Sequence, residues 1–147
     1  MQRTDIGPVL GQCNHLSKRL VAHQMQQYEF TSVQAHAMLF LIRNRHREEI
    51  TQQELERFLN IRPSTVNGVV ARLEEKGFIT RVPSKTDRRS KLLLLTEKGA
   101  QLQTVFETGI QQYEASLLRG FSPDEQAALR GYLLRIISNL EEDFNLC

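Results

Sequence analysis

The sequence has little of what secreted or membrane-bound chains require. Its 147 residues include two cysteines, Cys13 and Cys147, which are too few for a disulfide scaffold. No apolar stretch approaches the ~20 residues that a membrane-spanning helix needs. The opening residues, MQRTDIGPVLGQ, lack the apolar segment of a secretory signal. We therefore expect a single domain that folds around its own core in the cytoplasm, with no membrane as a partner.

The residue patterns of common enzymes and metal sites are also missing. Cys13 and His15 lie two positions apart, about 200° around a helix, so they cannot form a nucleophile and base pair with each other. The four histidines show neither an HExxH pair nor a CxxC partner, and no glycine-rich phosphate loop occurs. The sequence predicts a protein that is not an enzyme and has no cofactor and no metal. A zinc site assembled between helices is the alternative that these spacings leave open.

Charge is unevenly distributed along the chain. The net charge of +2 and the pI near 8.7 do not by themselves indicate a nucleic-acid partner. Between residues 81 and 91, however, five cations stand against one anion, a local charge of +4. The cations are Arg81, Lys85, Arg88, Arg89 and Lys91, and the anion is Asp87. The stretch SKTDRRSK at 84–91 is therefore either a solvated turn or a binding feature.

Apolar periodicity predicts helices over the first half of the chain. Residues 6–28 repeat apolar side chains at three- and four-residue steps. The sequences TSVQ (31–34) and TQQE (51–54) have the form of capping boxes, so helices are predicted from about 32 to 45 and from about 52 to 60. A fourth helix is predicted from Pro63 to Lys76, with Gly77 just after its end.

After Gly77 the apolar period changes from 3.6 residues to about 2. The segments FITRV (78–82) and KLLLL (91–95) flank the basic stretch, which predicts a hairpin. Thr96 is expected to cap a fifth helix that runs through Leu117, and SPDE (122–125) to start a sixth. This order predicts a mainly α fold with a small β wing, a winged helix-turn-helix with outer helices. Because the outer helices carry wide apolar stripes, we expect a second copy of the chain to cover them.

The predicted fourth helix has one face of small and polar residues. Val66, Val69, Val70 and Leu73 fall on the opposite, inward face. The residues of the outward face are Ser64, Thr65, Asn67, Gly68, Ala71 and Arg72. A glycine inside an exposed helix costs about 1 kcal/mol relative to alanine, so its presence favours close approach of the helix to a large surface. On this interpretation Ser64, Thr65 and Asn67 contact bases or phosphates, and Arg72 a phosphate or guanine. A solvated face is the alternative.

These segments resemble the MarR (multiple antibiotic resistance regulator) family of winged-helix transcription factors. The resemblance covers nearly the whole chain. It is most specific in STV (64–66), in LEEKGFITR (73–81) and in Asp87-Arg88-Arg89 with the following LTEKG (95–99). It implies one domain over residues 1–147, a DNA-binding lobe at 31–96, and dimerisation helices at 1–30 and 97–147. It also implies a homodimer that binds a pseudo-palindromic site in double-stranded DNA, most often as a repressor.

The resemblance also assigns roles to residues of the wing. In the family the arginine that matches Arg89 contacts DNA, and the aspartate that matches Asp87 helps to hold the wing in shape. Together with the reading of the fourth helix, this gives the predicted DNA-binding set. That set is Arg62, Ser64, Thr65, Asn67, Gly68, Arg72, Lys85, Arg88, Arg89 and Lys91.

Members of the family release DNA in response to a signal. Many bind a small aromatic or anionic effector, for which His15, Arg19, His36 and Phe40 are the candidate residues here. Others use an oxidised cysteine on the first helix, where Cys13 lies in this chain. GQCNHLSK lacks the aromatic residues of that branch, and a cysteine on an apolar stripe is more often a packing residue. A winged-helix protein-interaction adaptor that does not bind DNA is the remaining alternative.

Overall fold

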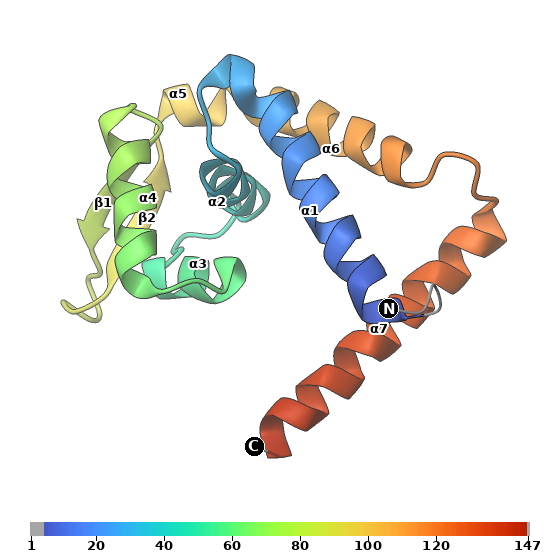
Figure 1. The fold of residues 1–147 in the computed structure, drawn as a ribbon. Coiled ribbons are helices and arrows are strands. Elements are labelled where there is room, and N and C mark those ends of the chain that lie inside the picture. Colours follow the sequence, from blue (N-terminus) through green and yellow to red (C-terminus); the bar gives the residue numbers. More distant parts are fainter. Residues whose placement is uncertain (1–4, 147) are drawn as a thin grey trace. The chain divides into compact units, whose positions relative to one another are not determined.

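The computed structural model describes residues 5–146, and the chain divides into two compact units, Met1–Ile110 and Gln111–Cys147. The elements in order are α1 (Ile6–Met25), the 3-10 helix η1 (Gln26–Tyr28), α2 (Ser32–Arg43), α3 (Gln52–Leu59), α4 (Pro63–Glu75), β1 (Ile79–Pro83), β2 (Lys91–Leu95), α5 (Glu97–Ala100), α6 (Gln103–Leu117) and α7 (Pro123–Leu146) (Figure 1). The predicted fold class, mainly α with a small β wing, is confirmed. The predicted boundaries of the lobe and the dimerisation helices stay predictions.

The capping boxes form as the sequence predicts. Thr31 Oγ1 accepts a hydrogen bond from the backbone N–H of Gln34, and Gln34 Oε1 accepts one from the N–H of Thr31, both at 3.2 Å. Thr51 and Glu54 exchange the same pair of bonds at the start of α3. Such a cap is worth about 1 kcal/mol to a helix. The starts of α2 and α3 are therefore fixed by local chemistry.

The helix predicted from Thr96 through Leu117 is interrupted. Its first turn is α5, and Leu102 N–H then bonds to Gly99 C=O at 3.2 Å, a tighter turn that separates α5 from α6. Gly99 allows α5 to lie against the base of the hairpin, because a Cβ there would lie 2.2 Å from the backbone oxygen of Phe78. Thr96 also donates its hydroxyl hydrogen to Gly77 C=O at 2.6 Å. Contacts with the base of the hairpin thus override the continuous helical pattern.

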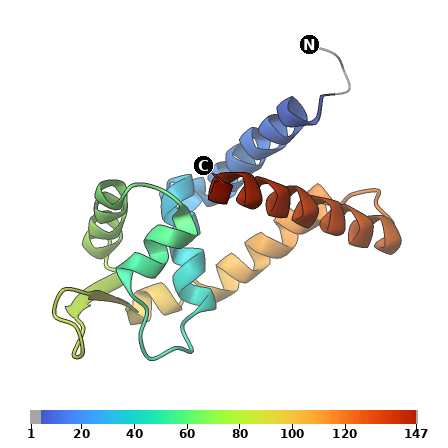
Figure 2. The same ribbon diagram turned by 90° about the horizontal axis from the view of Figure 1, so that it is seen from below.

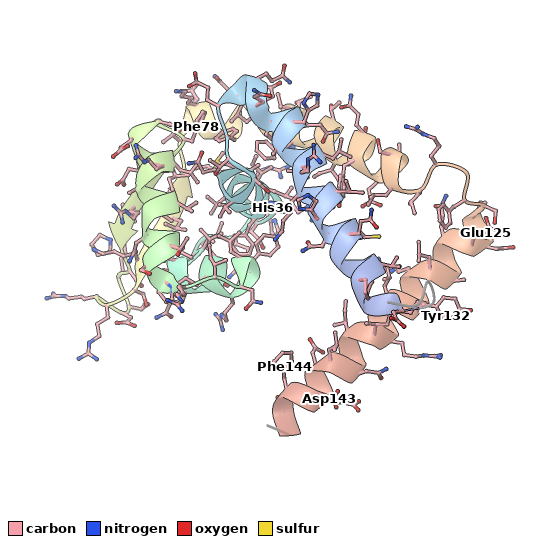
Figure 3. The ribbon with its side chains drawn as sticks, in the orientation of Figure 1. His36, Phe78, Glu125, Tyr132, Asp143 and Phe144 are labelled. Atoms are coloured by element: carbon pink, nitrogen blue, oxygen red, sulfur yellow. The ribbon has the colours of Figure 1, made fainter. Side chains whose placement is uncertain are left out.

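The core of the first unit lies between α2, α3, α4 and the hairpin. The fully buried side chains are Met38, Leu41, Leu55, Leu73, Ile79, Leu93, Val66 and Val70. Phe30 packs against Phe78 and Phe106, with ring centroids 5.0 and 6.0 Å apart. Figure 3 labels Phe78 beside the C-terminal end of α4. This core sets the position of α4 and of the hairpin that follows it.

Two lysines cover the aromatic cluster, which the sequence patterns did not predict. Lys76 lies 5.4 Å from the ring centroid of Phe30 and donates to the backbone oxygen of Glu29. Lys98 lies 4.6 Å from the ring centroid of Phe78 and donates to the backbone oxygen of Lys76 at 2.7 Å. The end of α4 is thereby tied to the segment between η1 and α2, whose residues are 47 positions earlier in the sequence.

Candidate nucleic-acid interface

Helix α4 buries one face and leaves the other open. Val66, Val70 and Leu73 have no exposed surface and pack into the core. The residues predicted to contact DNA from this helix are all exposed, namely Arg62, Ser64, Thr65, Asn67, Gly68 and Arg72. Arg62 begins the helix in an extended conformation, and its carbonyl accepts the N–H groups of Thr65 and Val66. The helix therefore presents a polar surface that the fold itself does not use.

Gly68 has no packing role within the described chain. A Cβ added at this position would meet nothing within 4 Å. Its φ angle lies in the helical range, so the backbone does not require glycine there. An alanine would fit and would favour the helix by about 1 kcal/mol. The small size of Gly68 is thus unexplained by the fold and matches a surface that another molecule approaches closely.

Arg72 is available on this face despite an acidic neighbour. Its guanidinium lies 3.5 Å from the carboxylate of Glu75, and both side chains are about two-thirds exposed. An exposed pair at this distance contributes 0 to ~1 kcal/mol. Arg72 can therefore leave Glu75 at little cost and bind a phosphate or a base edge.

The turn of the hairpin, residues 84–90, is held in shape by hydrogen bonds within the loop. Ser84 is buried, its N–H bonds to Ser90 C=O at 3.0 Å, and its hydroxyl oxygen accepts the N–H groups of Thr86 and Asp87 at 3.3 Å. Asp87 accepts a bond from the backbone N–H of Arg89 at 3.0 Å and one from the hydroxyl of Ser90 at 3.1 Å. Asp87 thus bonds to the turn backbone and to Ser90. These contacts agree with its predicted role of helping to hold the wing in shape.

Four cations of the hairpin are exposed. They are Lys85, Arg88, Arg89 and Lys91. None of them is in an ion pair within residues 5–146. Figure 3 shows nitrogen-tipped side chains extending from the turn, and Figure 2 shows the turn standing clear of α3 and α4. Their charge is available to an external anion.

Arg81 does not belong to this free charge. Its guanidinium lies 3.1 Å from Glu74 Oε1, and its backbone N–H donates to Glu74 Oε2 at 3.1 Å. These two bonds from Arg81, the side-chain bond first, lower the pKa of Glu74. The sequence count of +4 over residues 81–91 therefore becomes +3 over residues 82–91, four cations less Asp87. Arg81 instead joins the start of the wing to α4.

Glu54 links the start of α3 to the preceding loop and makes the fold sensitive to acid. Its carboxylate accepts the Thr51 N–H and lies 2.6 Å from the Arg47 guanidinium. These contacts, the Thr51 bond first, lower the pKa of Glu54 below its ordinary value near 4.5. A lowered carboxyl pKa stabilises the fold above the ordinary pKa, and this contribution is lost as pH falls through the folded-state pKa.

We expect Glu54→Gln to reduce the free energy of unfolding by about 1 kcal/mol at neutral pH, because Gln keeps the cap but loses the charge. The deficit should shrink on acidification, since wild-type Glu54 is then protonated. Urea unfolding of both proteins at about pH 7 and about pH 3 measures it. A deficit that stays constant with pH would contradict the assignment.

The four candidate effector residues come from two helices, α1 and α2. His15 and Arg19 are exposed on α1, whereas His36 and Phe40 are half-buried on α2. His36 Nδ1 lies 2.7 Å from Ser32 C=O, and Figure 3 places His36 on the side of α2 toward α1. Phe40 packs on Phe58 with centroids 4.9 Å apart.

A hollow of about 400 Å³ in the first unit has a different lining. Its residues are Ala22, His23, Gln26, Glu29, Phe30 and Thr31. The effector assignment therefore stays a prediction.

Cys13 is a free and exposed thiol on α1. Its position on an apolar stripe predicts a packing residue, but within its own chain Cys13 is not packed. Its redox role stays a prediction. Among residues 5–146, no group of three or more His, Cys, Asp or Glu side chains could hold a metal ion. Over the same residues, no helix is long and apolar enough to cross a membrane.

The sequence is similar to known regulators. The sequence model of the MarR family matches residues 31–91. An uncharacterized HTH-type transcriptional regulator, YybA of Bacillus subtilis, is 26% identical over 106 residues, which cover 72% of this chain and 71% of YybA. The transcriptional activatory protein BadR of Rhodopseudomonas palustris is 30% identical over 89 residues, 60% of this chain and 51% of BadR. The match thus spans about half of BadR.

Solved structures share the fold over almost the whole chain. MepR of S. aureus in complex with DNA superposes with a TM-score of 0.85 at 23% identity, covering 93% of this chain and 99% of MepR. The transcriptional regulator SlyA superposes with a TM-score of 0.82 at 25% identity, covering 97% and 99%. CouR of Rhodococcus jostii RHA1, bound to p-coumaroyl-CoA, has a TM-score of 0.76 at 20% identity, covering 90% and 91%.

Proposed function

Because the chain belongs to the MarR family of winged-helix transcriptional regulators, we propose that it binds a specific pseudo-palindromic sequence in double-stranded DNA as a homodimer. It is a transcriptional regulator and not an enzyme. We propose further that it acts as a repressor in the cytoplasm, where its DNA target lies, and that a small effector releases it.

One observation carries the proposal. The exposed face of α4 and the four free cations of the hairpin belong to the same unit, and Figure 1 shows the turn at the same end as the first turn of α4. A helix with small and polar residues fits the major groove, where base edges can be distinguished. Cations beside it fit the phosphates or the adjacent minor groove. A protein-interaction adaptor has no need of this pairing.

The exposed apolar side chains support the homodimer. In the first unit they include Ile6, Val9 and Leu16 of α1. In the second unit they include Phe121, Tyr132, Leu133, Leu134, Ile137, Leu140 and Phe144. Leaving this many large apolar groups in water is costly, and a second copy of the chain would cover them. A two-fold dimer is also what two half-sites one turn of DNA apart, about 34 Å, require.

The proposals for the effector and for the direction of regulation follow from the family resemblance. CouR is bound to a CoA ester, which is both aromatic and anionic, and this agrees in kind with the predicted effector. His15 and Arg19 on α1 and His36 and Phe40 on α2 remain its proposed contacts. BadR is named as an activator, so repression follows from the family resemblance alone. A reporter gene behind the DNA upstream of this gene, with and without the protein, measures the direction.

A salt titration tests the DNA-binding function. The purified protein is titrated onto labelled duplex DNA from upstream of its own gene, between about 50 and about 200 mM salt. Contacts with several phosphates predict a fall in affinity of at least about tenfold over that range. Negligible affinity at low salt, or affinity that does not respond to salt, would favour the adaptor alternative.

Arg89→Ala tests the wing within the same titration. If Arg89 meets a phosphate or a narrow minor groove, we expect weaker binding to all sequences and a salt slope reduced by about one unit. Arg81→Ala is the matched control, because Arg81 is held by Glu74 inside the lobe. The control should keep the slope, and a slope that Arg89→Ala leaves unchanged argues against wing contact.

A further inference from the structure

A hydrogen bond joins the start of α3 to the exposed face of α4. Gln52, the first residue of α3, donates from Nε2 to Oδ1 of Asn67, 15 positions later in the sequence. Gln52 is only 9% exposed, whereas Asn67 is exposed. A residue buried beneath the recognition surface thus holds the side chain of a residue on that surface. No sequence pattern predicted this pair.

The bond determines which end of the Asn67 amide is free. Oδ1 lies on the Gln52 side, and within residues 5–146 Nδ2 has no hydrogen-bond partner. Turning both amides over would leave the buried NH2 of Gln52 unpaired instead of its carbonyl, and buried unpaired N–H groups are the rarer case. Asn67 therefore presents N–H donors outward.

Gln52 is not explained by stability. Its Oε1 is buried and has no donor among the described residues. An unpaired buried acceptor destabilises a fold, and this cost offsets the hydrogen bond that Nε2 makes. The Gln52 side chain therefore adds little to the free energy of unfolding. The start of α3 is capped independently by Thr51 and Glu54. Among residues 5–146, the one hydrogen bond of the Gln52 side chain is the bond that orients Asn67.

We propose that Gln52 is a positioning residue that makes Asn67 a donor, so that the protein selects guanine or thymine at the base Asn67 meets. In the major groove guanine offers the acceptors N7 and O6, and thymine offers O4. Cytosine presents only the amino donor N4, and adenine places the amino donor N6 beside its single acceptor N7, so a donor-only side chain meets N6 unfavourably at adenine. An unrestrained asparagine would choose adenine, because its amide pairs with both N6 and N7. This inference rests on the proposed DNA-binding function and assigns its specificity at one position.

Selection of binding sites from a randomised duplex pool tests the proposal. The four proteins are wild type, Gln52→Met, Asn67→Ala and the double variant. Wild type should prefer guanine or thymine over adenine and cytosine by about tenfold at one position of each half-site. Gln52→Met keeps the side-chain length and frees the amide, so the preference at that position should move to adenine. The affinity of Gln52→Met for its own best site should stay within a few-fold of the wild-type value.

Two further readouts separate positioning from folding. The melting temperature of Gln52→Met should equal or exceed that of wild type, because the unpaired acceptor is removed. Gln52→Glu can only accept from Asn67, which turns Oδ1 outward and should shift the preference to adenine or cytosine. This second variant keeps the test decisive if Gln52→Met fails to fold.

Three outcomes overturn the inference. The first is a base preference that both Gln52 variants leave unchanged. The second is a change from Gln52→Met that persists when Asn67 is alanine, since the effect must pass through Asn67. The third is a wild-type protein that enriches no sequence although it binds the pool with a steep salt dependence. A wild type that does not bind the pool at any salt concentration removes the proposed function itself, and this inference with it.

Discussion

Gly68→Leu is expected to weaken binding to duplex DNA by about 100-fold, or about 2.7 kcal/mol, while the lobe stays folded. The space around Gly68 is open in the protein, so a larger side chain disturbs no intramolecular contact. In the proposed complex that space is filled by DNA, and a leucine would hold the helix away from the groove. The contacts of Ser64 and Asn67 beside it would then be lost together.

Gly68→Ala separates stability from binding at the same position. Alanine should raise the free energy of unfolding by up to about 1 kcal/mol and the melting temperature by about 2–4 °C. Its DNA affinity should be equal to or below that of wild type. Circular dichroism melting and DNA titration measure the two quantities.

The control for the leucine variant is Thr104→Leu, which adds a leucine at an exposed site on α6. The control should bind DNA as wild type does. Wild-type affinity in Gly68→Leu would show that α4 does not lie close to DNA, and glycine would then be only a tolerated residue on a solvated face.

Asp87→Ala is expected to weaken DNA binding by about tenfold, although it makes the wing more positive. If charge alone mattered, removing the carboxylate would raise the local charge from +3 to +4 and strengthen attraction to phosphates. The carboxylate, however, accepts bonds from the Arg89 backbone and the Ser90 hydroxyl. Without them the turn samples more conformations, and the cost of ordering it is then taken from the binding free energy.

Asp87→Asn is the matched control for this prediction. Asparagine removes the charge but keeps an oxygen that can accept the Arg89 N–H, and it tolerates turns well. Its affinity should be at or above the wild-type value. Equilibrium titration of the three proteins at one salt concentration measures the order. Tighter binding by the alanine variant would show that Asp87 is a bystander and that wing charge outweighs wing shape.

The sequence predicts correctly those features that depend on residues close together in the chain. Thr31, Thr51 and Ser122 stand three positions before a Gln or Glu, and each begins a helix with both reciprocal bonds in place. The hairpin followed from a change of period, and β1 and β2 pair from Ile79 with Leu95 to Pro83 with Lys91. The exposed face of α4 followed from helical spacing. Each of these depends on interactions within a few residues.

Contacts between distant residues were not readable in the same way. The close approach of Gly99 to the Phe78 backbone and the tighter turn after α5 are not visible in the helical periodicity, which is continuous through this segment. The pairing of Arg81 with Glu74 removes one cation from the free charge of the wing, which a count along the chain includes. The bond from Gln52 to Asn67 spans 15 positions and leaves no pattern in either helix.

The sequence by itself determined that this protein is mainly helical, where most of its helices begin, and that a basic hairpin follows a helix with a small polar face. Capping, periodicity and charge act over a few residues, so their effects can be predicted from the order of neighbouring residues. Only the tertiary structure decided which cations are free and which end of the Asn67 amide faces outward. Those properties depend on groups that packing brings together from separate elements. The ion pair and the hydrogen bond between these groups form only once the chain has folded.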